Sequence, residues 1–441
     1  MDQVQSYCPD NPLQILALED CTGDAAPPHP FDVPESGNNT IAFLQHSSGT
    51  TGVKKGVMLS HDQIDLQIKA CAQSLDLGPK DRIVSWLPLY HDMGLIACFV
   101  LPLALGIEVT YLDPFRWVAR PHSLFDAIGR HRGTLVWLPN FAFRHLVRAV
   151  PASGGSFDLS SIRAFVNCSE PCLNETLEEF VRTFEPMGVH AGQMSCSYAM
   201  AETVFSVSQT PPGQPVMKVE VDRDALAMDG ACLYPHKGTR QRQWLASSGR
   251  PLNGVEIRVI DEKGKAVADG CCGAIQIRCP FMFTGYFRDQ AKTTRAFDGD
   301  WYITRDRGFL HQGEVFVLGR IDDLIISNGR NFHAHEIEQI VSGIPGVISG
   351  RVAAFGHFSR TAGSHVLVIL AETDFDRANQ DSSSITRMIS QRVFDVLNIS
   401  PHDVVMLPPK TVIKTTSGKI HRTANKQLYE EGKLKSWNQP D

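Results

Sequence analysis

The segment from Gln45 to His61, QHSSGTTGVKKGVMLSH, constrains this chain most, because it concentrates residue types that can surround a phosphate group. Its glycines allow backbone conformations in which amide N–H groups turn toward an anion, and its hydroxyl side chains add further donors. A strand-like IAFLQ precedes it and a helix-like VMLSHDQIDLQIKA follows, so the pattern predicts a phosphate-binding loop between a strand and a helix. The loop lacks the GxxxxGK[ST] pattern of a Walker A loop, and an ordinary Gly/Ser/Thr surface loop is the alternative interpretation.

Length and composition narrow the class of protein. A chain of 441 residues is too long for one ordinary core and predicts two or three domains. The net charge of −6 gives no basic face for a nucleic acid. We expect a cytoplasmic protein without a membrane span, because neither a leader-like N-terminus nor a long apolar stretch occurs. The 11 cysteines lack zinc-site spacing and are expected to be free thiols in a reducing compartment.

Hydrophobic patterning predicts an α/β fold with two main domains. Residues 1–40 hold one strand candidate, LQILAL, and a Pro-rich linker. Strand-like and helical patterns then alternate up to about Pro211, which indicates parallel βαβ units. From about Arg250, short strands separated by Gly and Asp turns indicate an antiparallel sheet or small barrel-like part. A compact α+β segment ends the chain, so we expect one domain over 1–321 and a second over 322–441.

The phrase SSGTTGVKKG resembles the phosphate loop of the adenylate-forming superfamily, which includes acyl-CoA synthetases, peptide-synthetase adenylation domains and luciferases. Four further segments match that superfamily in the same order, and the resemblance extends from Ile41 to about Leu434. The resemblance implies ATP and Mg²⁺ as cofactors, and it places Thr51 close to the metal. The loop residues that it assigns to ATP are Ser47, Ser48, Gly49, Thr50, Thr51, Gly52 and Lys55.

Three of these segments imply the remaining nucleotide contacts. SCSYAMAETVFSVS resembles the YGxxE motif, which places Tyr198 against adenine and Glu202 at Mg²⁺. In WYITRDRG, Asp306 matches an aspartate that accepts hydrogen bonds from both ribose hydroxyls. GRIDDLIISNGRN resembles the interdomain hinge, in which Arg320 contacts ribose or phosphate and Asp322 changes its backbone torsions as the C-terminal lid rotates. Without the resemblance, these residues would be interpreted as turn or solvated surface positions.

The fourth segment, IKTTSGKIHR, resembles the last motif of the superfamily and aligns Lys419 with its catalytic lysine. Such an ammonium can bridge the substrate carboxylate and the α-phosphate as negative charge builds. Two positions depart from the superfamily pattern, since Ala199 and Arg305 stand where glycine is common.

Several phrases resemble those of fatty acyl-AMP ligases within the superfamily, namely SWLPLYHDMGLI, PNFAF, NCSEPCLNETLEEF and GRNFHAHEIE. They imply an acyl pocket formed by His91, Trp137, Asn140 and Cys168, with His91 also a catalytic candidate that gates the site. A core histidine bonded to its neighbour is the alternative for His91. The indole of Trp137 can shorten the acyl tunnel, which predicts a short, medium or aromatic acid, unless it only fills the core.

The expected reaction is activation of a carboxylic acid to acyl-AMP, followed by transfer to the phosphopantetheine thiol of a carrier protein in lipid, polyketide or nonribosomal peptide biosynthesis. A CoA synthetase is the alternative, because the segment from Gly285 to Asp306 is short, as in CoA ligases. A non-catalytic scaffold is a further alternative, supported by Ala199, Arg305 and Cys168 at glycine positions and by the short front segment. Missing front layers would expose apolar faces, which suggests either a homodimer or an incomplete chain.

Overall fold

The computed structural model describes residues 39–46, 55–150, 157–226, 233–239, 241–327, 330–359, 364–373, 382–415 and 418–434. Residues Met1–Thr40 and Ile41–Asp441 are two separate units, and only the second is considered below. The LQILAL strand candidate, the Pro-rich linker and the loop residues 47–54 lie outside the described residues. Within the described residues, no helix is both long and apolar enough to cross a membrane.

A seven-stranded sheet forms the centre of the larger part, with the order β11-β8-β7-β6-β5-β3-β4. Strands β4, β3, β5, β6 and β7 run parallel, while β8 and β11 add antiparallel strands at one edge. Strands β5 and β6 are buried along their whole length, as expected for strands covered on both faces. The predicted parallel βαβ architecture is confirmed. The strands are β3 (Arg82–Ser85), β4 (Glu108–Tyr111), β5 (Leu135–Leu138), β6 (Ala164–Cys168), β7 (Met194–Ala199), β8 (Ser206–Gln209) and β11 (Arg250–Pro251).

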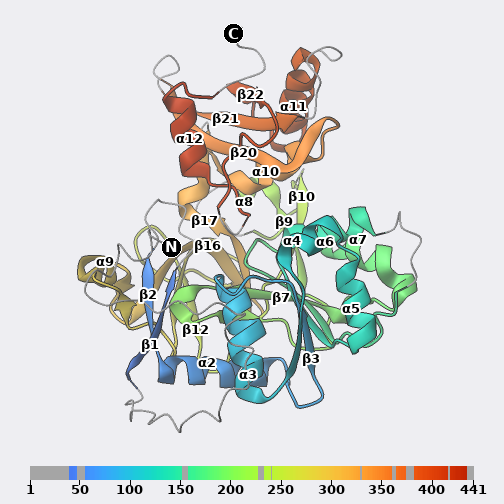
Figure 1. The fold of residues 1–441 in the computed structure, drawn as a ribbon. Coiled ribbons are helices and arrows are strands. Elements are labelled where there is room, and N and C mark those ends of the chain that lie inside the picture. Colours follow the sequence, from blue (N-terminus) through green and yellow to red (C-terminus); the bar gives the residue numbers. More distant parts are fainter. Residues whose placement is uncertain are drawn as a thin grey trace, which may run out of the picture. The chain divides into compact units, whose positions relative to one another are not determined.

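Helices cover this sheet on two sides: Figure 1 shows α2 and α3 on one side of the strands and α5, α6 and α7 on the other. The π-helical turn η2 continues directly into α3, and the amphipathic helices α5, α6 and α7 turn their apolar residues toward the core. The helices are α2 (His61–Ser74), η2 (Met93–Val100), α3 (Leu101–Leu105), α4 (Pro114–Ala119), α5 (Ser123–His131), α6 (Asn140–Ala149) and α7 (Asn174–Phe184).

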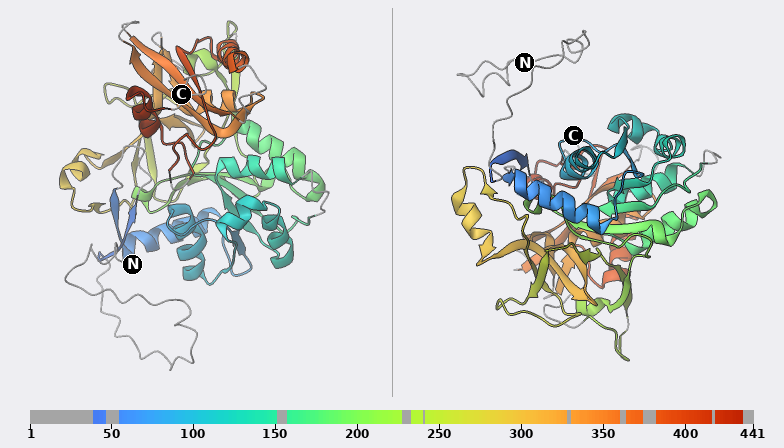
Figure 2. Two further views of the ribbon diagram at one scale, coloured as in Figure 1. Left: turned by 45° about the horizontal axis from the view of Figure 1, so that its top comes forward. Right: turned by 90° about the horizontal axis from the view of Figure 1, so that it is seen from below.

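The segment around the phosphate-loop motif differs from the expected strand, loop and helix. VMLS belongs to strand β2 (Gly56–Ser60), which pairs antiparallel with β1 (Ile41–His46), so the motif joins two strands of a hairpin. Helix α2 starts only at His61, where Ser60 and Gln63 form a reciprocal capping box that ends the strand. Strand β14 (Gly285–Tyr286) extends this sheet, and both views of Figure 2 show α9 (Gln290–Arg295) beside the hairpin.

The antiparallel part predicted after Arg250 is confirmed. Strands β12, β13, β16 and β15 follow one another in one sheet, and β17 pairs with β16, so the described pairing is that of an open sheet. Strands β9 and β10 form a separate two-stranded ribbon, and the short helix α8 directly follows β9. The elements are β9 (Lys218–Asp222), α8 (Arg223–Leu226), β10 (Arg242–Ala246), β12 (Glu256–Ile260), β13 (Gly273–Arg278), β15 (Phe297–Asp298), β16 (Trp301–His311) and β17 (Glu314–Arg320).

The C-terminal α+β segment has hydrophobic clusters of its own, built almost entirely from residues after Asp323. Strand β20 pairs antiparallel with β21, and β22 pairs parallel with β21. Figure 1 shows these strands grouped with α10, α11 and α12. The elements are η7 (Ile321–Asp323), β18 (Leu324–Ser327), β19 (Arg330–His333), α10 (Ala334–Ser342), β20 (Val347–Ser359), β21 (Ser364–Thr373), α11 (Ser382–Leu397), β22 (Asp403–Leu407) and α12 (Arg422–Glu430).

Candidate active site

The candidate acyl-side residues follow the carboxyl ends of neighbouring parallel strands. His91 lies in the loop after β3, where its Nδ1 is 2.5 Å from a carboxylate oxygen of Asp92. Both side chains are only partly accessible, at 15% and 17%, so the pair is neither a surface pair nor a core pair. Burial would raise the pKa of Asp92, but His91, helped by the Lys419 charge and the Met93 N–H, holds that pKa below its usual range. The structure shows the histidine bonded to its neighbour, and the gating role of His91 stays a prediction.

Gly94 fixes the path of this loop. A Cβ atom at Gly94 would lie 2.3 Å from the carbonyl oxygen of Pro88, so any other residue would push the loop away from η2. The glycine of the LYHDMG phrase therefore allows His91 and Asp92 to lie over the start of η2.

The other acyl-side candidates lie on β5, α6 and β6. Trp137 is fully enclosed on β5 with 1% exposure, and its indole N–H has no partner among the described residues. Asn140 begins α6 and accepts a 2.9 Å hydrogen bond from the amide of Asn167. Cys168 ends β6, and burial together with the nearby Asp92 carboxylate raises the pKa of its thiol to about 12. Cys168 is therefore a neutral thiol next to the His91–Asp92 pair.

Lys419 lies in a tight loop of the C-terminal segment. Its backbone N–H donates to the Thr415 hydroxyl at 3.2 Å, and its carbonyl accepts from Thr415 N–H at 2.8 Å. The positive charge of Lys419 is one of several influences that lower the pKa of Asp92. The catalytic role of Lys419 stays a prediction.

A second group lies where β7 meets the antiparallel sheet. The Tyr198 hydroxyl donates to the Asp306 carboxylate, and the Arg320 guanidinium lies 3.4 Å from the other oxygen of that carboxylate. Asp306 and Arg320 are register partners on β16 and β17, which explains how two distant motifs meet. Burial raises the pKa of Asp306 even though Arg320 opposes the shift. Tyr198, Asp306 and Arg320 therefore form one contact group.

Glu202 adjoins this group from the turn after β7. It is 7% exposed and accepts a 2.8 Å hydrogen bond from the Tyr286 hydroxyl, which lies 3.4 Å from the Tyr302 hydroxyl. The Lys55 ammonium lies 4.8 Å from the centre of the Tyr286 ring. Burial lowers the pKa of Lys55, although the charge of Glu202 opposes this shift. Lys55 is the one predicted phosphate-loop residue that the structure describes, and it is beside Glu202.

Arg305 and Asp322 interact directly. Arg305 has a φ of 62°, in the left-handed region that favours glycine, which accounts for the glycine expected at this position. Its guanidinium donates to the carboxylate of Asp322, the predicted hinge residue in η7. The departure from glycine therefore adds a contact to the hinge that a glycine lacks.

Sequence reasoning missed Asp92, Tyr286 and Tyr302. Asp92 adjoins His91 in the same phrase, and its charge was the available signal. The two tyrosines had no such signal, because their roles depend on a contact between β14, β16 and the turn after β7.

The doubly covered parallel sheet, the antiparallel sheet that contacts it through Asp306, and the C-terminal α+β segment form an α/β architecture that matches solved structures of adenylate-forming enzymes. The chain belongs to the AMP-binding enzyme family, whose profile matches residues 4–287. Its family and its named relatives show that it is an acid–AMP ligase.

Two curated relatives illustrate the match. The medium-chain-fatty-acid–[acyl-carrier-protein] ligase JamA of Moorena producens is 30% identical over 92% of this chain and 70% of its own length. The long-chain-fatty-acid–AMP ligase FadD32 of Mycolicibacterium smegmatis is 29% identical over 91% of this chain and 70% of its own length.

Solved structures agree in fold. One from a study of fatty acyl-adenylate ligases of E. coli and L. pneumophila has a TM-score of 0.83 at 30% identity, covering 90% of this chain and 70% of that chain. The McyG A-PCP structure with phenylalanyl-adenylate has a TM-score of 0.82 over 98% of this chain and 64% of that chain, and at 22% identity it supports the fold alone.

Proposed function

We propose that this protein uses ATP to activate a carboxylic acid as acyl-AMP with release of pyrophosphate, and then transfers the acyl group to the phosphopantetheine thiol of a carrier protein. In the first step, a carboxylate oxygen attacks the α-phosphorus while the bond to the pyrophosphate oxygen breaks. In the second step, the thiolate attacks the acyl carbon and AMP leaves. The relatives named for fatty acyl-AMP and acyl-carrier-protein ligation support this proposal.

One observation carries it: Tyr198, Asp306 and Arg320 contact one another and leave acceptor capacity that a nucleoside could use. Lys419 would add a cation for the developing negative charge. Asp306 would accept the ribose hydroxyls and Tyr198 would lie against adenine. Lys419 would stabilise this charge on the α-phosphate. We further propose that residues 322–441 form a lid that turns at Asp322, which their separate hydrophobic clusters support.

Glu202 fits a magnesium ion, because it is a buried carboxylate whose described hydrogen bond comes from a neutral tyrosine. Hard oxygen ligands suit Mg²⁺, which would neutralise phosphate charge when bound. Thr51 is the other residue proposed for this role and lies outside the described residues. Tyr286 would orient the carboxylate through its hydroxyl.

The acyl pocket would be bounded by His91, Trp137, Asn140 and Cys168. Because Trp137 is enclosed on β5, we propose that it closes the far end of the pocket and selects short, medium or aromatic acids. A CoA synthetase is the second candidate, favoured by the short connection from β14 through α9 to β16. A putative acyl-CoA synthetase of Caulobacter vibrioides is among the relatives, with 29% identity.

The test is carboxylate-dependent pyrophosphate release, measured over short, medium, long-chain and aromatic acids with Mg²⁺-ATP. We expect Lys419→Ala to reduce release by about 100-fold or more while ATP binding persists. Lys426→Ala, on α12 of the same segment, is the matched control and should keep normal activity. Silence of the folded wild-type protein across the whole panel would contradict the proposed function and favour a binding scaffold.

A further inference from the structure

The short helix α8 is attached to the larger part of the molecule at both of its ends. At its start, the Asp222 carboxylate accepts hydrogen bonds from the backbone N–H groups of Asp224 and Ala225, at 2.9 and 3.4 Å, and so caps the helix. At its end, the Leu226 carbonyl accepts a 2.9 Å hydrogen bond from the guanidinium of Arg307, a buried residue of β16. The backbone of α8 is therefore held in place by the ribbon and the antiparallel sheet.

The first two side chains of α8 extend to the C-terminal segment, which lies next to this helix in Figure 1. The Arg223 guanidinium donates to the Glu336 carboxylate in α10, and the Asp224 carboxylate lies 2.9 Å from the Arg330 guanidinium in β19. Arg330 also donates to the carbonyl of Leu397 at the end of α11, at 3.3 Å. We call Arg223, Asp224, Arg330 and Glu336 the α8 clasp, in which each side contributes one positive and one negative group.

The α8 clasp is better shielded from solvent than an ordinary surface pair. The side chains of Arg223 and Glu336 are 20% and 23% exposed, whereas those of Arg242 and Glu220, a pair within the same ribbon, are 50% and 31% exposed. Water and salt screen partly buried charges less than exposed ones. The alternation of sign also disfavours a shifted arrangement, because like charges would then face each other. The clasp therefore stabilises one particular placement of α10 against α8.

This placement bears on the turning of the C-terminal segment. The contact between Arg305 and Asp322 lies at the hinge itself, whereas the clasp lies beyond β18 and resists rotation from further out. Contacts that exist in only one of two orientations shift the equilibrium toward that orientation by their own free energy. In the orientation described here, the positive charge of Lys419 helps to lower the pKa of Asp92 beside His91. The clasp is therefore formed while Lys419 acts on the acyl side of the site.

We propose that Arg223 and Asp224 are positioning residues for acyl-AMP formation, which hold the C-terminal segment in the orientation of the first step and release it before acyl transfer. Neither residue would touch the acid, ATP or the thiol, because both act through Glu336 and Arg330. This inference rests on the proposed function, in which residues 322–441 turn between the two steps.

The first test reverses one charge of the clasp and then restores the pair. Arg223→Glu places two carboxylates against each other, so we expect pyrophosphate release in a single turnover to slow about 10-fold. Acyl transfer from chemically synthesised acyl-AMP to a holo-carrier protein should not slow, since that step requires the clasp to open. Arg223→Glu combined with Glu336→Arg restores opposite charges and should recover about half or more of the wild-type rate.

The matched control for this test is Arg242→Glu. It makes the same change of charge in the same ribbon and breaks the 2.9 Å pair with Glu220, which does not extend to the C-terminal segment, so both rates should stay normal. An equal loss in both steps, a loss that the exchanged pair does not recover, or an equal loss in the control would overturn the proposal.

The second test fixes the clasp covalently. Arg223→Lys keeps the charge and supplies a primary amine, which a water-soluble carbodiimide condenses with the Glu336 carboxylate to an amide while the carbodiimide becomes a urea. Peptide mapping by mass spectrometry detects the link without any need for catalysis. We expect the linked protein to release pyrophosphate in one turnover and to fail in acyl transfer, and wild-type protein treated with the same reagent controls for the modification of other carboxylates.

Two outcomes of the second test would overturn the proposal. Absence of a link between positions 223 and 336 would contradict the contact, and acyl transfer by the linked protein at the rate of the treated wild-type protein would contradict its role. Absence of pyrophosphate release from untreated wild-type protein would instead count against the proposed function, and the mapping result would still test the clasp.

Discussion

Asp306 in β16 and Glu338 in α10 are both buried carboxylates whose pKa burial raises, yet their surroundings differ. Glu338 accepts two hydrogen bonds from Arg422, at 2.8 and 2.7 Å, and a third from the Ala354 N–H at 3.1 Å. Asp306 has the Tyr198 hydroxyl and an Arg320 contact at 3.4 Å, which leaves acceptor capacity unused. Burial alone therefore does not distinguish the two carboxylates; they differ in the hydrogen-bonding capacity that remains, and only Asp306 could accept further bonds from a ligand.

The largest effect is expected when Glu338, the carboxylate with all its hydrogen bonds satisfied, loses its partner. Arg422→Met leaves Glu338 buried without its partner and also removes the 2.6 Å contact with Asp323, so the unfolding free energy should fall by about 3–5 kcal/mol. Urea denaturation measures this change. Arg392→Met, at an exposed position of α11, should change it by no more than about 0.5 kcal/mol. A small loss in Arg422→Met would show that the pair is structurally dispensable.

The next effect concerns the unsaturated carboxylate. Asp306→Asn keeps the shape but removes the charge and one acceptor, so the Kd for ATP should rise about 10- to 100-fold, equivalent to about 1.4–2.8 kcal/mol. The unfolding free energy should change much less than in Arg422→Met, because Asp306 has only one contact with a guanidinium, at 3.4 Å from Arg320. Titration calorimetry with ATP gives the Kd, and Asp300→Asn on the exposed turn nearby is the control. Unchanged ATP affinity would remove Asp306 from the proposed nucleotide site.

A pH titration sharpens the same contrast. Because burial raises the pKa of Asp306 above 3.8, the ribose acceptor becomes protonated at a higher pH than an exposed aspartate, and ATP affinity should weaken as pH falls through that raised pKa. The sign for stability is opposite: a raised folded-state pKa means that this group's contribution to the unfolding free energy does not fall on acidification. Lowering the pH should therefore weaken ATP binding before unfolding begins, and Asp306→Asn should flatten the profile.

The smallest expected effect concerns Arg305. Replacing it by glycine relieves the left-handed backbone conformation, by about 1–2 kcal/mol, and removes an exposed ion pair worth at most about 1 kcal/mol. The net change should therefore be a gain in stability of about 0–2 kcal/mol. If the Asp322 contact holds the hinge, the ratio of acyl transfer to adenylation should change while the adenylation rate does not. Quenched-flow measurement of the two half-reactions, with Arg295→Gly as a surface control, tests this. An unchanged ratio would leave Arg305 as an exposed ion pair without influence on the hinge.

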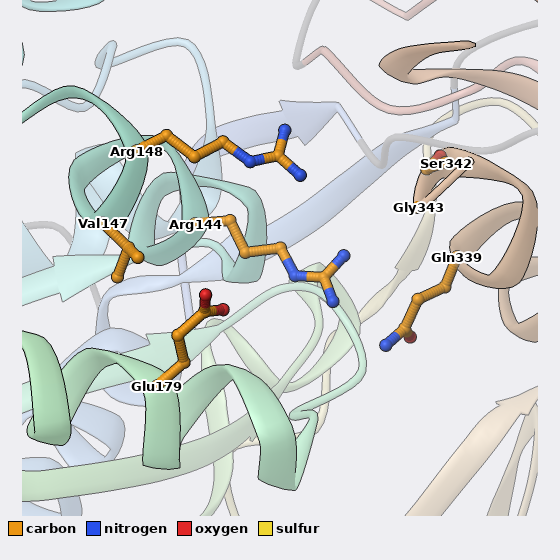
Figure 3. A pocket seen from close by; sticks show the side chains of 7 residues that line it. All are labelled: Arg144, Val147, Arg148, Glu179, Gln339, Ser342 and Gly343. Carbon is orange, nitrogen blue, oxygen red and sulfur yellow. The ribbon is translucent and has the colours of Figure 1, made fainter. Parts of the chain in front are cut away.

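The alternation of strands and helices from Arg82 to Ala149, and the later α+β segment, could be predicted because buried strands and amphipathic helices leave clear periodicities. VMLS was misassigned to a helix because it continues directly into one, and only its pairing with β1 makes it a strand. Tyr198, Asp306 and Arg320 could be named by resemblance, but their mutual contacts depend on the register of β16 and β17. The cleft that Arg144 and Arg148 line (Figure 3) could not be predicted from the sequence, because it forms only where α10 lies beside α6 and α7, which are far from it along the chain.

Tyr286 connects two parts of the site through a single side chain. Its backbone is held opposite Val57 in the hairpin sheet, its hydroxyl holds Glu202, and its ring lies under Lys55. A rigid aromatic ring transmits displacement with little loss, because it has only two side-chain torsions to absorb it. A displacement of the hairpin would therefore also move the Glu202 carboxylate, because the Tyr286 side chain sets the distance between the hairpin and Glu202.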